Sequence, residues 1–239
     1  ISDSKNHHPG IDNRGPFLSM NPFSSRCCQH NHAQGWPYFT EHLVLATPDN
    51  GVATAIYAAC KATVKVGDGK EITFREETNY PFEEGITFTV STDEKVAFPF
   101  YLRIPSWTQK AEVRVNGKKV SAAPVAGKYL CINREWANGD RVELTLPMSL
   151  SMRTWQVNKN SVSVDYGPLT LSLKIAEKYV EKDSRETAIG DSKWQKGADP
   201  RKWPTTEIYP DSPWSYSLVL DKKEPLKNFK VIRKSWPAD

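Results

Sequence analysis

The chain has 239 residues and a formal net charge of +4, from 32 Lys or Arg and 28 Asp or Glu. This length allows one large all-β domain or two smaller ones, with a substantial hydrophobic core. Because opposite charges are interspersed, the composition indicates a solvated surface of mixed sign and argues against a nucleic-acid-binding tail. No apolar stretch approaches the roughly 20 residues of a membrane-spanning helix. We therefore expect neither nucleic acid nor a membrane as a partner.

The N-terminal region has no signal-peptide pattern. Residues 1–26 indicate an irregular loop, because prolines and glycines recur in them. The first ten residues are polar and contain no element that would anchor them to a domain. We therefore expect a fragment whose natural N-terminus lies upstream.

One helix is expected, from about Asn31 to Thr47, where aromatic and aliphatic residues recur at helical spacing. Residues 48–51, Pro-Asp-Asn-Gly, are turn residues and should end it. An amphipathic helix is expected to bury its aromatic stripe. The alternative is that Trp36, Tyr38 and Phe39 form an exposed platform for sugars.

The chain after Gly51 shows a β pattern throughout. Asn116-Gly117 between two apolar runs is a strong hairpin signal. Turns about every 8–12 residues indicate an antiparallel sandwich and not a parallel α/β sheet. Residues 181–213 form a polar excursion that contains Trp194 and Trp203, two candidates for sugar stacking. The expected strands are residues 52–59, 62–66, 71–78, 86–91, 96–104, 113–115, 118–120, 129–132, 142–146, 161–164, 169–173, 216–220 and 229–232.

Chemically reactive side chains concentrate around the adjacent Cys27 and Cys28, which His30 and His32 follow. Neighbouring Cα atoms lie about 3.8 Å apart, less than the roughly 4.4–6.8 Å of an ordinary disulfide, so the pair should not bond to itself. Thiolates are nucleophiles and zinc ligands. The pair could therefore bind metal, act as a catalyst, or consist of two inert thiols. Because zinc takes four ligands, a metal site here would need ligands from elsewhere.

The other cysteines and the paired acids suggest no chemistry of their own. Cys60 and Cys131 lie in apolar runs and are expected to be small buried hydrophobes; no bridge between them is indicated. The members of Glu76-Glu77 and of Glu83-Glu84 would point to opposite faces of a strand. We therefore expect solvated edge charges and not the facing pair of acids that glycoside hydrolysis normally uses.

Several ordered motifs together resemble the β-L-arabinofuranosidase-like family of glycoside hydrolases. The resemblance covers most of the chain. Its motifs are Cys27-Cys28-Gln-His-Asn31 through Gly35-Trp-Pro37, Asp49-Asn-Gly51, Ile56-Tyr57, Thr63-Val-Lys-Val66, Glu77-Thr-Asn-Tyr-Pro81, Leu102-Arg-Ile-Pro-Ser-Trp107, Val113-Arg-Val-Asn-Gly117 and Tyr166-Gly-Pro-Leu169.

This resemblance implies an (α/α)6 barrel followed by C-terminal β-sandwiches. In the family, the first cysteine of the adjacent pair is the proposed nucleophile and a zinc ligand, and the second is also a ligand. Cys27 and Cys28 match those positions, and Asn31 matches the asparagine of the motif. The remaining zinc ligands and the glutamate acid/base lie upstream in the family. The chain alone is therefore expected to be inactive.

The resulting fold prediction is a mainly β protein, with one or two antiparallel β-sandwiches after a loop and a short helix left from the barrel. The predicted domains are the tail of the missing barrel (residues 1–47), a sandwich (48–150) and a second sandwich or a continuation of the first (151–239).

The predicted function is that of a C-terminal fragment of a zinc-dependent retaining glycoside hydrolase. Its partners would be an arabinofuranose-containing or related plant-type glycan and the missing barrel, and its location periplasmic or extracellular. The alternatives are a non-catalytic β-sandwich that serves as an accessory or carbohydrate-binding module, and a self-contained zinc module.

Overall fold

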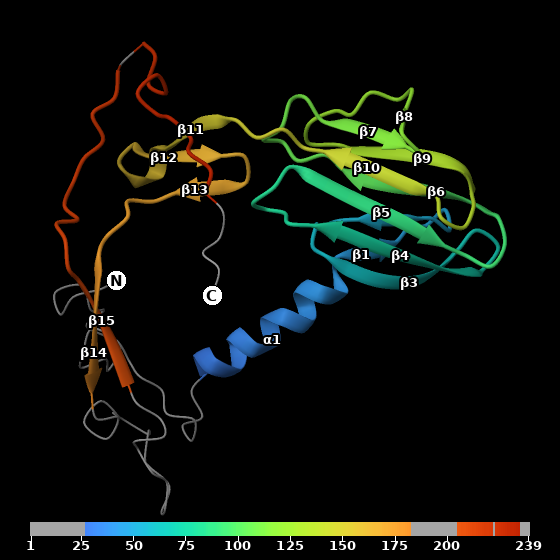
Figure 1. Cartoon of the computed structure of the whole chain (residues 1–239), viewed down its shortest axis with the longest axis horizontal. Helices are drawn as coiled ribbons and strands as arrows, with labels where there is room; N and C mark the ends of the chain where they lie inside the picture. The colour runs from blue at the N-terminus through green and yellow to red at the C-terminus, as the bar shows by residue number, and fades with distance from the viewer. Residues whose placement is uncertain (1–26, 183–204, 222, 235–239) are drawn as a thin grey trace, which may run out of the picture. The chain divides into compact units, whose positions relative to one another are not determined.

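The computed structural model describes residues 27–182, 205–221 and 223–234. These residues belong to two compact units. Of the described residues, the larger unit contains 38–172, 220–221 and 223–234, and the smaller contains 27–37, 173–182 and 205–219. Figure 1 shows the strands of both units. None of the helices in the described ranges is long and apolar enough to cross a membrane.

The larger unit is built on two sheets, as the alternating pattern predicts. In the four-stranded sheet the order is β1 (Val44–Ala46), β2 (Val52–Thr54), β6 (Val96–Arg103) and β9 (Tyr129–Trp136). In the six-stranded sheet it is β3 (Cys60–Val66), β4 (Lys70–Thr78), β5 (Gly85–Ser91), β10 (Arg141–Thr145), β7 (Glu112–Val115) and β8 (Lys118–Lys119). All neighbouring strands are antiparallel except β2 and β6, which are parallel. The chain must therefore cross from one sheet to the other between β2 and β6.

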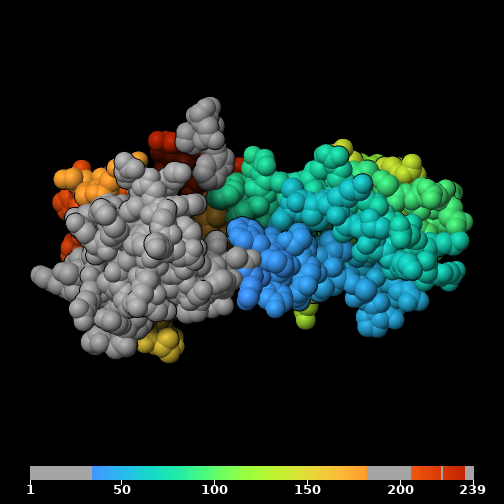
Figure 2. Space-filling model, turned by 90° about the horizontal axis from the view of Figure 1, so that it is seen from below, coloured from blue at the N-terminus to red at the C-terminus, as the bar shows by residue number. Residues whose placement is uncertain are grey.

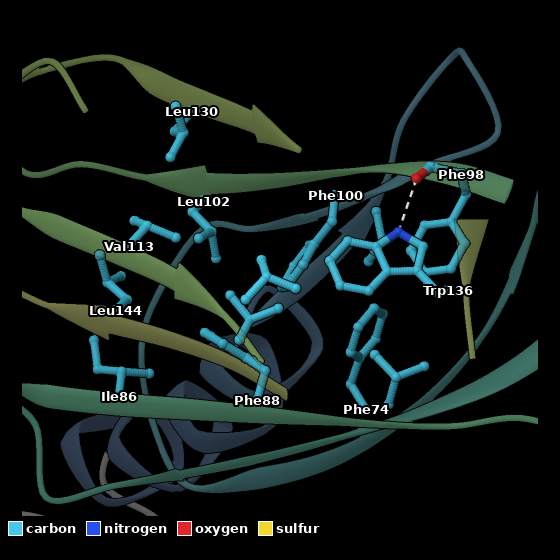
Figure 3. Packing of buried hydrophobic residues seen from close by; sticks show 14 of the residues in the cluster. Phe74, Ile86, Phe88, Phe98, Phe100, Leu102, Val113, Leu130, Trp136 and Leu144 are labelled. Atoms are coloured by element: carbon cyan, nitrogen blue, oxygen red, sulfur yellow. Dashed lines mark hydrogen bonds between the residues drawn. The ribbon is translucent and has the colours of Figure 1, made fainter. Parts of the chain in front are cut away.

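The core lies between these sheets, and its largest members are aromatic (Figure 3). Phe74 of β4 stacks on Phe100 of β6 with ring centroids 4.8 Å apart. Trp136 of β9 is fully buried, and its Nε1–H donates a hydrogen bond of 3.0 Å to the carbonyl oxygen of Phe98. A buried indole N–H needs such a partner. Both sheets therefore contribute to one continuous core.

Turn chemistry sets the hairpin register where it was predicted. Asn116 and Gly117 both have positive φ, 51° and 77°, as a two-residue turn of this kind requires. The Asn116 side chain also donates to Asp140 and accepts from the Arg141 N–H. The turn is thereby tied to β10, the neighbouring strand.

A separate three-stranded antiparallel sheet follows in the larger unit: β11 (Leu150–Trp155), β12 (Ser161–Tyr166) and β13 (Leu169–Leu171). A 3-10 turn, η1 (Gln156–Asn158), joins β11 to β12. The smaller unit contains the ribbon β14 (Glu177–Lys182) and β15 (Thr205–Pro210). The sequence patterns did not predict β11, β14 or β15, and β15 lies inside the predicted polar excursion.

The helix α1 (Cys27–Glu41) begins and ends earlier than predicted. Residues 44–46, which were expected to be helical, form β1 instead. They pair with β2 across the Pro48–Gly51 turn, and this pairing overrides their helical spacing. The expected burial of the aromatic stripe is also wrong: Trp36 and Tyr38 are 62% and 63% exposed. The end of α1 forms part of the surface in Figure 2, in blue.

Four further predictions fail within the described residues. Residues 55–59 leave β2 and form no strand, while residues 216–220 and 229–232 form none either. Cys131 is exposed, because its neighbour Leu130 faces the core and successive strand residues alternate. Cys60 is half-buried, and both of these thiols are free.

Trp136→Phe should lower the free energy of unfolding by about 2–4 kcal/mol, because it leaves the Phe98 carbonyl without its donor and opens a cavity. Trp155, which is largely exposed, provides the control. Trp155→Phe should cost less than about 1 kcal/mol. Urea unfolding measures both; equal losses in the two variants would contradict this account of the core.

Candidate functional site

The predicted nucleophile stands at the start of α1. The helix begins at Cys27 and continues through Cys28, so Asn31 follows Cys27 by one helical turn. The side chains of residues 27–33, and Trp194 and Trp203 as a whole, lie outside the described residues. Across the residues that are described, no group of three or more His, Cys, Asp or Glu is placed to hold a metal ion. The roles of Cys27 and Cys28 therefore remain predictions.

The described part of the chain has a groove of about 520 Å³ on the four-stranded sheet. We call this the tyrosine groove, after the two aromatic residues in it. The β1–β2 turn, β2, β6 and β9 supply its lining, which consists of Thr47, Pro48, Asp49, Ala53, Tyr101 and Tyr129.

The strand register explains why these residues meet. Ala53 of β2 pairs with Tyr101 of β6, and Tyr101 pairs with Cys131 of β9. Tyr129 lies two residues before Cys131, so it is the diagonal neighbour of Tyr101 on the same outer face. Diagonal partners have Cα atoms roughly 7–8 Å apart. Tyr101, Tyr129 and the small Ala53 therefore line the same groove.

A carboxylate is fixed at the rim of the groove. The Tyr101 hydroxyl donates to Asp49 Oδ2 at 2.6 Å, and the Thr47 hydroxyl donates to Oδ1. These hydrogen bonds lower the pKa of Asp49 below its usual value, and the one from Thr47 has the largest effect. The hydrogen bond to Asp49 also raises the pKa of Tyr101. At neutral pH the groove therefore presents a carboxylate and a neutral phenol.

The turn that carries Asp49 leaves no space for a side chain at Gly51. A Cβ there would meet the Pro99 carbonyl oxygen at 2.3 Å. The Gly51 N–H donates to Thr47 Oγ1, and the Thr47 N–H donates to the Gly51 carbonyl oxygen. The Asp-Asn-Gly motif thus places Asp49 through close backbone contact with β6.

Glu76 overturns one prediction. Although it was expected to be a solvated edge charge, Glu76 is only 2% exposed, while Glu77 on the opposite face is exposed. The Cys60 thiol donates to Glu76 Oε2 at 3.9 Å, and Glu76 Oε1 is one of two buried side-chain atoms without a partner in the described residues. Burial raises the pKa of Glu76 to about 8. This carboxyl is largely protonated at neutral pH.

A family model matches the central part of the chain. Residues 51–148 match the family model described as the middle domain of GH127 β-L-arabinofuranosidase. The predicted resemblance to the β-L-arabinofuranosidase-like family is therefore confirmed. No curated protein matches it.

Three solved structures resemble this chain. One, described as a glycoside hydrolase, is 28% identical with a TM-score of 0.60, over 76% of this chain and 29% of its own. The GH127 β-L-arabinofuranosidase of Geobacillus stearothermophilus T6 is 24% identical with a TM-score of 0.56, over 79% and 34%. A GH127 β-arabinofuranosidase is 24% identical with a TM-score of 0.54, over 71% and 31%. The chain thus spans about a third of each of these proteins, and the last two likenesses show the fold alone.

The Gly51→Ala substitution should destabilise the larger unit by about 2 kcal/mol, because the new methyl group clashes with the Pro99 backbone. Gly85→Ala is the matched control, since nothing lies within 4 Å of a Cβ at Gly85. Chemical denaturation should find the control within about 0.5 kcal/mol of the parent. A Gly51→Ala protein as stable as the control would show that the turn does not depend on this contact.

The raised pKa of Glu76 predicts a pH-dependent stability. The folded state holds the proton more tightly than the unfolded state, so this contribution is complete below about pH 4.5 and is lost as the pH rises through about 8. As the pH rises from 5 to about 9, the free energy of unfolding of Glu76→Gln should therefore increase by about 2–4 kcal/mol relative to that of the parent. Unfolding measured across this range tests it. In the control Glu77→Gln, the free energy of unfolding should change with pH as it does in the parent. The same pH dependence in Glu76→Gln would refute the assignment of this effect to Glu76.

Proposed function

We propose that this chain is the C-terminal part of a zinc-dependent, retaining glycoside hydrolase that acts on arabinofuranose-containing or related plant-type glycans. The observation that carries the proposal is the order of its parts. The helix α1 begins with Cys27-Cys28 and ends at Glu41. The match to the GH127 middle domain (residues 51–148) begins ten residues later. The relatives described as β-L-arabinofuranosidase or β-arabinofuranosidase suggest the sugar.

Cys27 is the proposed nucleophile. Its sulfur would attack the anomeric carbon and displace the leaving sugar oxygen, which takes a proton from an acid outside this chain. Water would then release the sugar from the thioglycosyl enzyme, so two inversions retain the configuration. The position of Cys27 at the start of a 15-residue helix supports this role, because the positive end of the helix dipole favours a thiolate.

Zinc is the proposed cofactor, held in part by Cys27 and Cys28. The donor set fits the metal in type, because thiolates are preferred zinc ligands. The two sulfurs fill two of four tetrahedral positions, and the other ligands would come from outside this chain. Bound zinc would keep the sulfurs deprotonated at neutral pH.

The proposed intramolecular partner is an (α/α)6 barrel upstream of the helix. The exposed aromatic side chains of α1 support it, because Trp36 and Tyr38 are large apolar groups of the kind that protein interfaces cover. We propose that residues 1–239 alone do not hydrolyse glycans. A periplasmic or extracellular location, where such polymers occur, completes the proposal.

A second candidate function is glycan binding without catalysis. The tyrosine groove specifically favours it, because exposed aromatic and polar side chains meet there in a concave surface.

The decisive experiment for the catalytic role replaces Cys27 in the parent enzyme. Cys27→Ser should lower kcat by about 10³-fold or more on an arabinofuranoside, because a hydroxyl is far less ionised than a thiol. Cys131→Ser is the control, since Cys131 is exposed on β9. It should retain full activity.

Metal analysis separates the two proposed roles of the cysteine pair. The parent enzyme should hold one zinc per chain, and Cys28→Ala should lose it together with activity. Full turnover by Cys27→Ser, or an active parent without zinc, would defeat the corresponding part of the proposal.

A further inference from the structure

We propose that the tyrosine groove is a binding site for a neutral sugar unit. The site lies on the outer face of the four-stranded sheet and consists of residues that the catalytic proposal does not use. The choice of a sugar as ligand rests on the proposed function, whereas the existence of a ligand site rests on the groove itself.

The groove offers an apolar wall of the kind that sugar rings require. Tyr129 is 49% exposed, and Tyr101 lies diagonally beside it on the same face. The C–H groups of a sugar ring are apolar, so they gain free energy when they cover phenol rings and displace water. Ala53 lies next to Tyr101 and leaves space that a larger side chain would fill.

The rim supplies polar partners for the hydroxyls of a sugar. Asp49 is exposed, and its carboxylate accepts hydrogen bonds only. Tyr101 donates its own proton to Asp49, so its phenol oxygen can act toward a ligand only as an acceptor. A neutral polyol has many O–H donors and satisfies both groups. An anionic ligand would meet the charge of Asp49 without a cationic side chain in the lining.

The polar part of the site is held in place before a ligand arrives. Thr47 and Tyr101 fix the two oxygens of Asp49, and the close contact of Gly51 with Pro99 fixes the turn. Groups that are already oriented lose little conformational entropy on binding. This arrangement distinguishes the groove from an exposed tyrosine on a flat surface.

The chain offers a matched control for that distinction. Tyr179 on β14 is 62% exposed, and its hydroxyl also donates to a carboxylate, that of Glu177. Like Tyr129 it is an exposed tyrosine on a strand, but it does not line the groove.

Titration of the 239-residue chain with L-arabinose and neutral arabino-oligosaccharides, followed by NMR and calorimetry, tests the proposal. We expect saturable binding, with shifts centred on Thr47–Ala53, Tyr101 and Tyr129. Tyr129→Ala should weaken binding by roughly tenfold or more, and Tyr179→Ala should leave it unchanged. Equal effects of the two substitutions, or no saturation at millimolar sugar, would overturn the proposal.

Asp49→Asn and a charged ligand test the polar part of the site. Asp49→Asn should weaken the binding of neutral sugars, and glucuronate should bind less tightly than glucose to the parent chain. Tighter binding of the acidic sugar, or binding only of cations or peptides, would refute a neutral-sugar site. Because Cys27→Ser should leave binding in the groove unchanged, a failure of the catalytic proposal remains distinguishable from a failure of this one.

Discussion

The burial of alternate residues of β6 against the six-stranded sheet is the constraint on which the rest of the larger unit depends. Phe98, Phe100 and Leu102 face inward and are almost completely buried. Because a strand alternates its faces, Tyr101 must then face outward. Packing of the core and construction of the groove are therefore one event, and a shift of β6 by a single residue would destroy both.

The β1–β2 turn connects this constraint to chemistry. Parallel pairing of β2 with β6 brings Ala53 next to Tyr101, and the turn that precedes β2 brings Asp49 to the Tyr101 hydroxyl. Two sequence segments about fifty residues apart thus form one hydrogen-bonded group. Tyr129, from a third segment, completes the aromatic wall through the β6–β9 register. The groove is a product of strand order and not of any local motif.

The carboxyl groups of Asp49 and Glu76 lie in different environments. Asp49 is exposed and held ionised by hydroxyl donors, whereas Glu76 is buried with one oxygen unpartnered, and burial raises its pKa. Burial disfavours a carboxylate far more than a few weak donors can offset. The first environment suits recognition of ligand hydroxyls at neutral pH. The second makes the stability of the fold depend on pH.

The sequence by itself determined the β class, the strands with strict alternation and the Asn116-Gly117 hairpin, because period-two burial and positive-φ turns are local properties. It also carried the motifs that led to the GH127 resemblance. It did not predict that Asp49 and Tyr129 lie beside Tyr101. It also wrongly predicted a helix at residues 43–46 and burial of Cys131. Only tertiary structure decided these points, because pairing between distant strands determines which faces are covered and which side chains meet.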